Sequence, residues 1–405
     1  MSIGLFLTKI QMFLFYFLMF FGIYQLFICL FAFSKKREKT IQNAKNYRFM
    51  AVIPARNEEK VIRDVIRSLK KQTYPYVDIY VIADNCTDNT ARDARFEGVM
   101  VYERTDNEKR RKGYALEWFF EKIMHEKPDE YDAFCIFDAD NIVKEDFFEK
   151  MNEKFCEGET IVQGYRDIRN PGESWVADNY AIFYWTMNKL YHEARYHLGL
   201  SPLVNGTGFA VSMDILKESN GFHSDTLTED IEFSVENILK GHKVAWAEEA
   251  IVYDEQPTKF GQSFRQRLRW SVGHIQCFHK FFLRAFGSKK ADVTQVDVMI
   301  YLLGMPMFLV SMVITLIDVI KVIFLKEYSY FTLLDGMKFS TTLTLISVIQ
   351  SLVILLLEKK NIKKVWKGIA TYPIFLLSWL MVNVIAFVKG KLEWKPIVHE
   401  GNGIQ

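Results

Sequence analysis

The sequence predicts an α/β domain with a mostly parallel sheet, flanked by apolar segments long enough to cross a membrane. Over residues 47–260, short apolar runs alternate with helix-like patterns, as they do in chains where strands and helices alternate. Nearly charge-free stretches lie toward both ends of the 405 residues. Two aspartates, Asp138 and Asp140, directly follow the apolar run 133–137. This pattern is typical of a buried strand that ends at a ligand-binding edge of a sheet.

The N-terminal segment, residues 1–34, is predicted to be a membrane anchor. Its stretch 10–33 is almost free of charge and exceeds the roughly 20 residues that span a bilayer. It is too long for a signal-peptide core and has no small-residue cleavage pattern. The residues that follow are strongly basic: Lys35, Lys36, Arg37 and Lys39. Because basic flanks favour the inner side of the membrane, we expect the next domain, residues 35–260, to be cytoplasmic.

The elements of this domain can be assigned from periodicity. Strands are expected at 49–53, 77–83, 99–102 and 133–137. The acids of Asn57-Glu58-Glu59 suit the positive end of a helix dipole, so a helix is expected to start there. Apolar residues then repeat at helical spacing: Val61, Ile62, Val65, Ile66 and Leu69.

Composition excludes several classes of function. The net charge of +2 provides no global field for nucleic acid, so we expect no nucleic-acid partner. The five cysteines are scattered and lack C-x-x-C spacing, which argues against a zinc site or a disulfide framework and favours a reducing compartment.

Residues 261–297 are predicted to form amphipathic helices in the cytoplasmic headgroup region. Up to residue 290 they interleave Lys and Arg with aromatic residues and contain no acid. Nucleic-acid binding is a weaker interpretation of this stretch because apolar segments follow it directly.

Further membrane helices are expected within residues 298–390, at about 298–325, 339–357 and 369–388. Lysines between 359 and 367 place the connection after the second of these in the cytoplasm. Three crossings would then leave the tail, residues 391–405, outside. A cytoplasmic tail would require one segment to be re-entrant or interfacial, and the sequence leaves both arrangements open.

Two strand ends carry candidate ligands. Asp138-Ala139-Asp140 offers two hard oxygen ligands, which together with phosphates are the usual ligands of Mg²⁺ or Mn²⁺. An Asp-rich turn would explain the triplet alone equally well. Asp84 ends the run 77–83, and a carboxylate there can accept the N3–H of a uracil ring. By itself this signal is weak, since Asp-Asn turns are common.

Two other motifs offer a base and a cation. Thr228-Glu229-Asp230 precedes the helical pattern 231–240. Either Thr228 or Asp230 caps this helix, or a carboxylate there is a general base for a hydroxyl nucleophile.

On a helix, Gln266, Arg269 and Trp270 share one face. Arg269 suits a departing diphosphate, and Trp270 offers a flat surface to a sugar. A snorkelling interfacial Arg/Trp pair is the alternative interpretation.

In this order, the motifs resemble those of the membrane-embedded processive family-2 glycosyltransferases, which include the cellulose, hyaluronan and poly-N-acetylglucosamine synthases. The resemblance covers about residues 47–275. It includes Ile53-Pro54-Ala55-Arg56-Asn57-Glu58, Asp84, Asp138-Ala139-Asp140, Thr228-Glu229-Asp230 and the Q-x-x-R-W of Gln266, Arg269 and Trp270. It implies a GT-A fold, Mg²⁺ or Mn²⁺ as cofactor, and inverting transfer from a UDP-sugar donor to a growing polysaccharide acceptor.

The resemblance also implies a role for each motif residue on the nucleotide side. Asp84 would hold the uracil, Asp138 would contact the nucleotide, and Asp140 would bind the metal. Pro54 and Glu58 belong to the same nucleotide site. Where many relatives have Asp-Gly, this chain has Asp84-Asn85, so the geometry of that turn stays open.

On the acceptor side, the resemblance makes Asp230 the catalytic base, supported by Thr228 and Glu229. Gln266, Arg269 and Trp270 would line the leaving group and the acceptor end. Lys112 is a further candidate for the diphosphate, although a solvated basic turn explains it equally well.

We therefore expect a multi-pass cell-membrane synthase with a cytoplasmic catalytic domain and the lipid bilayer as a partner. Glucose is slightly favoured over N-acetylglucosamine as the monomer. Four spans are few for an export channel within one chain, so we expect a homo-oligomer or a small membrane partner. One rival is a single-transfer enzyme with a lipid acceptor, as in ceramide glucosyltransferases. Another is a scaffold with an inactive domain, in which Asp230→Asn and Asp140→Ala would change nothing.

Overall fold

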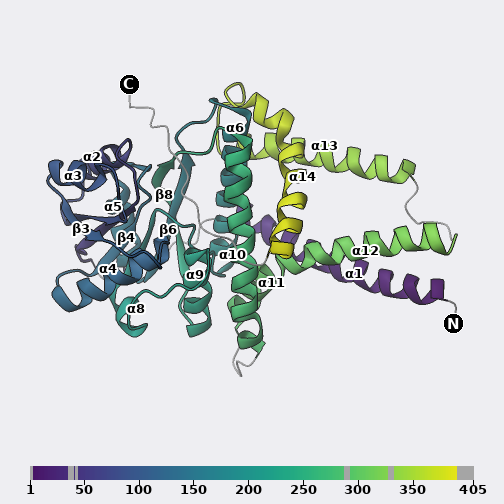
Figure 1. Cartoon of the computed structure of the whole chain (residues 1–405), viewed down its shortest axis with the longest axis horizontal. Coiled ribbons are helices and arrows are strands. Elements are labelled where there is room, and N and C mark those ends of the chain that lie inside the picture. Colours follow the sequence, from purple (N-terminus) through teal and green to yellow (C-terminus); the bar gives the residue numbers. More distant parts are fainter. Residues whose placement is uncertain (1–2, 35–40, 42–43, 287–291, 327–332, 390–405) are drawn as a thin grey trace.

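The computed structural model describes residues 3–34, 41, 44–286, 292–326 and 333–389 (Figure 1). Its centre is an eight-stranded sheet with the order β3-β2-β1-β4-β7-β6-β8-β5. The strands are β1 (Phe49–Ala55), β2 (Val77–Asp84), β3 (Met100–Arg104), β4 (Ala133–Ile136), β5 (Ile142–Val143), β6 (Ile161–Ile168), β7 (Phe209–Ser212) and β8 (Val244–Asp254).

The sheet is mixed, although most of its strands are parallel. β1 pairs in parallel with β2 and β4, and β6 pairs in parallel with β8. β7 runs antiparallel between β4 and β6, and β5 runs antiparallel to β8. As a result, β1, β2, β4, β6 and β8 all end at the same edge of the sheet. Side chains that follow these strands can therefore meet.

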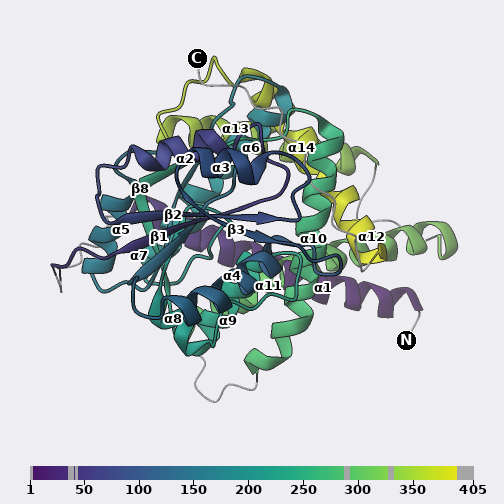
Figure 2. The same cartoon turned by 60° about the vertical axis from the view of Figure 1, so that its left-hand side comes forward.

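Helices cover both faces of the sheet, as predicted (Figure 2). Alternate residues of β1 face two separate cores: Phe49 and Ile53 face one, and Met50 and Val52 face the other. The first core includes α2 (Ile62–Lys70) and α5 (Phe147–Cys156), with α3 (Thr90–Phe96) at its edge. The second core includes α4 (Lys112–Glu126), α8 (Met213–Glu218) and α9 (Glu229–Lys240).

The prediction that a helix starts at Asn57 is wrong, because α2 begins at Ile62. Asn57 has a φ of 58°, which a helix does not allow. Its side-chain oxygen accepts a 2.8 Å hydrogen bond from the backbone N–H of Thr87. The backbone N–H of Glu58 donates to Thr90 Oγ1 at 2.8 Å. These bonds fasten the turn after β1 to the loop after β2.

Several helices lie between the sheet and the apolar segments. They are α6 (Trp175–Thr186), a π-helical stretch η2 (Met187–Glu193), α7 (Ala194–Leu198), α10 (Phe260–Phe286) and α11 (Val293–Leu302). α10 carries the Q-x-x-R-W motif. In Figure 1, α10 stands upright next to the sheet domain.

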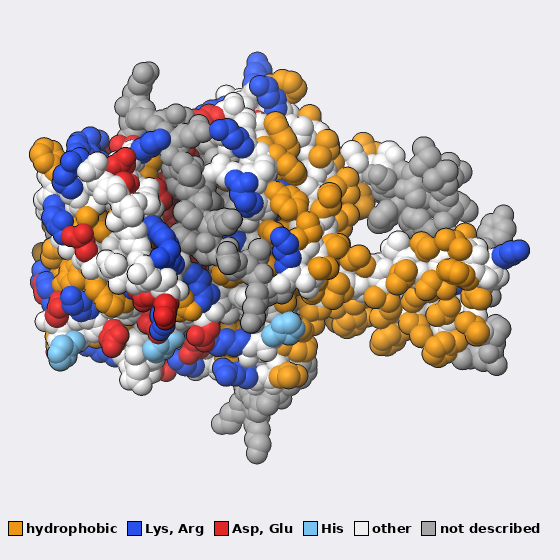
Figure 3. All heavy atoms as spheres, in the orientation of Figure 1, with side chains coloured by type: hydrophobic (Ala, Val, Ile, Leu, Met, Phe, Trp, Pro, Cys, Tyr) orange, Lys and Arg blue, Asp and Glu red, His pale blue; other side chains and the backbone are white. Residues whose placement is uncertain are grey.

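The apolar segments form α1 (Ile3–Leu30), followed by a short 3-10 turn, and then α12 (Gly304–Phe324), α13 (Leu333–Leu357) and α14 (Trp366–Lys389). Three described helices are long and apolar enough to cross a membrane: Ile3–Phe33, Gly304–Phe324 and Trp366–Lys389. Hydrophobic side chains cover the projecting helices, whereas charged ones gather on the sheet domain (Figure 3). The tail 391–405 lies outside the described residues.

The expected span 298–325 is not one helix, because the chain is divided into α11 and α12 at Leu303. Pro306 is the third residue of α12. There its missing N–H costs no helical hydrogen bond. α11 packs against α9 and α10, so only α12 continues away from the domain.

Candidate active site

Three carboxylates meet at the shared edge of the sheet. Asp138 and Asp140 follow β4, and Asp254 is the last residue of β8. One ligand oxygen from each lies within 4.8 Å of the others. Asp140 and Asp254 are buried, while Asp138 remains partly exposed. A set of hard oxygen ligands in this arrangement suits Mg²⁺ or Mn²⁺.

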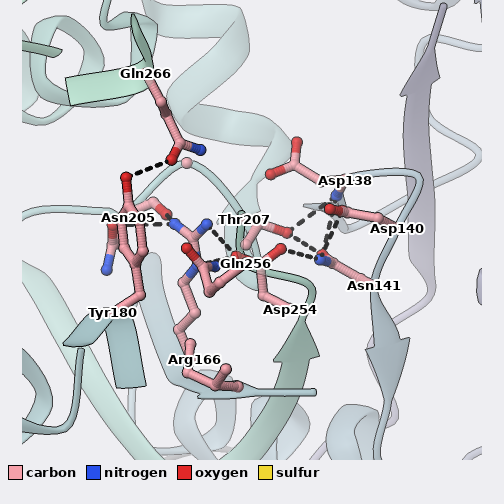
Figure 4. Close-up of polar contacts among 12 residues, drawn as sticks. Asp138, Asp140, Asn141, Arg166, Tyr180, Asn205, Thr207, Asp254, Gln256 and Gln266 are labelled. Carbon is pink, nitrogen blue, oxygen red and sulfur yellow. Dashed lines mark hydrogen bonds and ion pairs between the residues drawn. The ribbon is translucent and has the colours of Figure 1, made fainter. Parts of the chain in front are cut away.

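A network of buried polar groups holds these carboxylates in place (Figure 4). Asn141 Nδ2 donates to Asp254 Oδ1 at 2.9 Å and to Asp140 Oδ1 at 3.3 Å. Arg166 Nε donates to Asp254 Oδ2 at 2.9 Å. Thr207 Oγ1 accepts from the backbone N–H of Asp138 at 3.0 Å and donates to Asn141. Residues just after β4, just before β7, in β6 and at the end of β8 therefore fix one cluster.

The two motif aspartates lie in different electrostatic surroundings. Burial and the nearby charge of Asp254 raise the pKa of Asp140 well above its usual range. Burial also opposes ionisation of Asp138, but the cations Lys112 and Arg166 more than offset it and lower the pKa of Asp138. A buried carboxylate beside two others is costly without a cation. The donor set therefore fits a divalent metal.

Lys112 lies at the centre of the site rather than in a solvated turn. Its Nζ donates to Asp138 at 2.5 Å and to the carbonyl of Gly206 at 2.6 Å, and it lies 3.8 Å from Glu229. Burial opposes its charge, but Asp138 and Glu229 outweigh this and raise its pKa. Lys112 thus links the β4 carboxylates to the start of α9.

Asp230 lies in the first turn of α9, which begins at Glu229. Its Oδ1 accepts a 2.9 Å hydrogen bond from the backbone N–H of Ile231. The N-cap residue Thr228 makes no side-chain capping bond. Desolvation and the neighbouring charge of Glu229 raise the pKa of Asp230 to about 6. A group with this pKa is largely ionised at pH 7 and can still accept a proton.

The Q-x-x-R-W residues of α10 face the same region. Gln266 Oε1 accepts a 2.8 Å hydrogen bond from the hydroxyl of Tyr180 on α6 (Figure 4). Arg269 Nη1 donates to the carbonyl of Leu227 at 3.4 Å, beside the start of α9. The Trp270 ring packs edge-on against Tyr180 and stacks on Trp379 of α14, with centroid distances of 6.1 and 6.5 Å.

One cavity of about 270 Å³ joins most of these groups. Its lining contains these residues: Lys112, Asp138, Arg166, Asn205, Thr228, Glu229, Asp230, Gln266, Arg269 and Trp270. The lining also contains apolar and aromatic residues: Phe183, Tyr184, Met187, Tyr191, Tyr301, Met305 and Trp379. A cleft lined by both charged groups and aromatic rings can hold both a nucleotide-linked sugar and an acceptor.

A model of the glycosyltransferase like family 2 matches residues 47–273, which is more than half of the chain. The chain belongs to this family. The matched residues include every motif on which the predicted resemblance rests, and the synthase-type resemblance is confirmed. The protein is a family-2 glycosyltransferase enzyme.

Relatives of this glycosyltransferase include three described enzymes. Poly-beta-1,6-N-acetyl-D-glucosamine synthase of Staphylococcus epidermidis is 24% identical over 82% of this chain and 81% of that protein. Probable glycosyltransferase YdaM of Bacillus subtilis is 24% identical over 64% of this chain and 63% of its own. Glucomannan 4-beta-mannosyltransferase 7 of Arabidopsis thaliana is 26% identical over 62% and 46%. The chain thus matches less than two thirds of YdaM and about half of the plant enzyme.

The fold of this glycosyltransferase is similar to that of a solved enzyme, the mannosyltransferase PcManGT from Pyrobaculum calidifontis in complex with GDP-Man and Mn²⁺. The TM-score is 0.62, with 14% sequence identity, and the match covers 93% of this chain and 99% of PcManGT. The predicted GT-A fold with flanking apolar helices is therefore confirmed.

Of the residues predicted for the nucleotide, Lys112 and Asp138 line the cavity, whereas Pro54 and Asp84 lie along the same sheet edge outside its lining. Pro54 is in β1, and Asp84 is the last residue of β2, the strand that pairs with β1. Asp84 Oδ1 accepts from Arg104 Nη1 at 2.6 Å and from Asn85 Nδ2 at 2.9 Å. Asn85 takes the left-handed conformation, with a φ of 53°. Asparagine tolerates this conformation better than most residues, so it can replace the glycine of the relatives.

Asp254 and Arg166 are functional candidates that the sequence analysis missed. Asp254 follows the apolar run 250–253, which is the same signal that identified Asp138. Arg166 lies in β6, whose residues are all buried. A charged residue inside a fully buried strand is uncommon without a partner. Here that partner is Asp254.

Proposed function

We propose that the protein is an inverting membrane glycosyltransferase that transfers a hexose from a UDP-sugar to the hydroxyl of a growing polysaccharide. The observation that carries this proposal is a cavity that Asp230 lines together with Lys112, Arg269 and Trp270. These groups come from α4, α9 and α10. Together they supply the base, cations and sugar platform that one direct displacement requires.

In the proposed reaction, Asp230 takes the proton of the acceptor hydroxyl while its oxygen attacks the anomeric carbon. The bond from that carbon to the diphosphate breaks, and UDP leaves with the bonding electrons. Inversion follows because one displacement occurs on the face opposite the leaving group. Arg269 and Lys112 stabilise the charge that develops on the diphosphate. A divalent cation held by Asp138, Asp140 and Asp254 would neutralise part of the same charge when bound.

N-acetylglucosamine is the first monomer to test, with glucose as the alternative. The match to the Staphylococcus epidermidis enzyme covers most of both chains, and that enzyme is a poly-beta-1,6-N-acetyl-D-glucosamine synthase. The narrower match to the plant mannosyltransferase does not distinguish between sugars. We propose that the product is a polymer. We expect the enzyme to act as a homo-oligomer or together with a small membrane partner.

A second candidate is transfer of one sugar to a lipid. Two residues that line the cavity favour this candidate. Met305 belongs to α12 and Trp379 belongs to α14, and both helices are apolar. A lipid-bound acceptor entering from the bilayer would meet these side chains first.

The test uses purified full-length protein in lipid vesicles, with Mn²⁺ or Mg²⁺ and single UDP-sugars. UDP release with UDP-N-acetylglucosamine and a glycanase-sensitive polymer would support the proposal, whereas an organic-extractable glycolipid would favour the second candidate. Asp230→Asn should lower kcat about 10²- to 10⁴-fold, the usual contribution of a general base, while donor binding by calorimetry stays intact. Unchanged turnover in Asp230→Asn and in Asp140→Ala would refute catalysis at this site and support an inactive scaffold.

A further inference from the structure

The last turns of α1 contact the catalytic domain, so this helix does more than anchor the chain. We propose that α1 sets the acceptor part of the cavity through a buried clamp. In this clamp, Tyr24 of α1 holds the ion pair of Arg195 and Asp297. The pair in turn fixes Tyr191 and Tyr301, which line the cavity. The clamp itself rests on structural contacts, whereas its effect on an acceptor rests on the function proposed above.

α1 has two parts with different surroundings. Between residues 3 and 23, most of its large apolar side chains are exposed, as suits a helix in lipid. Residues 24–33 pack against η2 and α7 instead. Ile28 and Ala32 share an apolar cluster with Ala194 and Leu200. The carbonyl of Phe31 lies 3.2 Å from Nδ1 of the histidine at position 197. Figure 1 shows the other end of α1, marked N, projecting away from the domain.

A buried ion pair connects α7 and α11 to α1. Arg195 Nε donates to Asp297 Oδ2 at 2.9 Å, and Arg195 Nη2 donates to Asp297 Oδ1 at 3.2 Å. The hydroxyl of Tyr24 donates to the same Oδ1 at 2.9 Å. Gln25 Oε1 accepts from Arg195 Nη2 at 3.3 Å. Arg195 and Asp297 are each only 1% exposed. Because a buried charge is strongly unfavourable without its partner, this pair favours one arrangement of the three helices.

Two aromatic rings connect the ion pair to the cavity. Tyr191 lies four residues before Arg195, and Tyr301 lies four residues after Asp297, so each ring is about one helical turn from its charged residue. The Arg195 guanidinium lies 3.9 Å from the centre of the Tyr191 ring, as in a cation–π contact. The centroids of the two tyrosine rings are 5.6 Å apart. The ion pair outside the cavity lining therefore fixes two rings within it.

The element that carries Tyr191 is unusual. η2 is a π-helix of seven residues, a form that is rare and often occurs at functional sites. Its residues Met187, Tyr191 and His192 line the cavity. The carbonyl of Leu190 in the same stretch accepts a 3.7 Å hydrogen bond from Cys29 Sγ of α1. α1 thus contacts the π-helix whose side chains reach the cavity.

Tyr301 lies where an acceptor would meet the catalytic base. Burial and the charge of Asp230 raise the pKa of Tyr301. The ring of His274 stacks on Tyr301 with centroids 4.9 Å apart, and burial lowers the pKa of His274 to about 4. Both rings are therefore uncharged at pH 7 and suit a neutral sugar better than a diphosphate. Since the attacking hydroxyl must reach Asp230, we assign this part of the lining to the acceptor.

The proposal can be tested by removing one hydroxyl from the full-length enzyme. Tyr24→Phe deletes the hydrogen bond to Asp297 and keeps the ring. Tyr16→Phe, at an exposed position of the same helix, is the matched control. With UDP-N-acetylglucosamine saturating, Tyr24→Phe should raise KM for a β-1,6-linked N-acetylglucosamine pentamer about three- to tenfold, the equivalent of one hydrogen bond.

The clamp acts on the acceptor alone, so KM for the donor and the Mn²⁺ requirement should stay at parent values in Tyr24→Phe. Tyr16→Phe should match the parent in all three quantities. A merely structural role would instead reduce the yield of folded enzyme or change both KM values together. A rise in both KM values, or in neither, would overturn the inference.

Coupling between the clamp and the ring provides a second readout. If Tyr24 acts through Tyr301, Tyr24→Phe should no longer change KM for the pentamer in a Tyr301→Ala background, because the ring to be positioned is gone. Contacting residues that act together give such non-additive effects, whereas independent sites give additive ones. Additive effects of the two substitutions would contradict the proposed connection.

Amide hydrogen exchange tests the clamp without any sugar. In Tyr24→Phe, exchange should become faster in residues 187–201 and 293–302, while β1 and α2 keep the parent rates. Equal exchange in Tyr24→Phe and Tyr16→Phe would overturn the clamp, even in an enzyme that transfers sugar. A parent chain that releases UDP from no UDP-sugar would refute the proposed function, and the exchange comparison would still decide whether the clamp exists.

Discussion

At the scale of single residues, Asp230 lies among groups that act on its proton in opposite directions. Desolvation and Glu229 favour the protonated form, whereas the backbone N–H of Ile231, Lys112 and Arg269 favour the ionised form. Desolvation and the charge of Glu229 prevail, and they raise the pKa of Asp230 to about 6. The base is therefore poised near the working pH.

The pH dependence of turnover should report this carboxylate. Because Asp230 must be ionised to accept a proton, kcat/KM should rise with pH, with an acid limb near pH 6, and level off above it. Glu229→Gln removes a charge that raises this pKa, so its acid limb should shift to lower pH. Initial rates of UDP release between pH 4.5 and 8 measure both curves. If the acid limb does not move in Glu229→Gln, the limb does not report the ionisation of Asp230.

Asp254 provides a second prediction at this scale. Asp254→Asn removes one of the three clustered carboxylates, so the Mn²⁺ concentration for half-maximal activity should rise about tenfold or more, by analogy with the loss of ligand support in other metal sites. Glu248→Gln, at an exposed position on the same strand, is the matched control and should leave the Mn²⁺ requirement unchanged. Equal metal curves for the two variants would exclude Asp254 from the metal site.

At the scale of elements, the site depends on a close approach between α10 and the start of α9. A Cβ added to Gly273 of α10 would lie 2.5 Å from Thr228 Cγ2 and 2.9 Å from the Thr228 backbone nitrogen. This glycine lets the Q-x-x-R-W helix pack directly against the turn that carries Asp230. Glycine is helpful here because it has no side chain, although it weakens the helix itself.

Gly273→Ala should therefore separate α10 from α9. Overpacking typically costs about 1–3 kcal/mol, so we expect a lower melting temperature and reduced kcat. Gly261→Ala on the same helix is the control, because its added Cβ would meet only Arg265 Nη1, at 3.9 Å. That control should keep kcat and equal or exceed the stability of the parent, since alanine favours helix. Full activity in Gly273→Ala would show that this approach is not needed.

A bulge in the sheet explains how β8 brings Asp254 to the cluster. Gly164 pairs with Ala247 and Tyr165 pairs with Ile251, so β8 contains extra residues between these pairs. Extra residues on one strand bend it and increase its twist. A Cβ on Gly164 would lie 2.6 Å from the carbonyl of Ala250, so glycine is required at the bend.

At the scale of the whole molecule, a polar cluster couples the apolar helices to the sheet. Lys360, between α13 and α14, donates to Asp167 of β6 at 2.6 Å. Asp167 also accepts from Trp185 Nε1 on α6 at 2.7 Å. The neighbouring residue in β6 is Arg166, which holds Asp254. Neighbouring residues of one strand therefore contact the apolar helices and the candidate metal site.

Lys360→Gln should weaken this coupling. The pair is partly exposed, and the loss of a charged hydrogen bond at such a site costs about 1–2 kcal/mol. The apparent melting temperature in detergent should therefore fall by a few degrees. Lys359→Gln, at an exposed neighbouring position, should leave it unchanged. Equal melting temperatures for both variants would show that the contact contributes nothing to docking of the helices.

Much of this protein could be predicted from local signals. The strands that contain Phe49, Val77 and Ala133 begin where the apolar runs begin, because burial on both faces requires continuous apolar residues. Asp138, Asp230 and Trp270 were identified by short motifs and do line one cavity. Such motifs can be recognised from the sequence because each is confined to a few neighbouring residues.

The sequence by itself determined the alternation of strands and helices, the apolar segments and the motif residues, since periodicity and residue type act over short distances. Only the tertiary structure decided that Asp254 joins Asp138 and Asp140, because strand order and the bulge in β8 bring together residues more than a hundred positions apart. It also decided how α1 packs. Hydropathy measures how apolar a helix is, whereas its position depends on which other helices cover its faces.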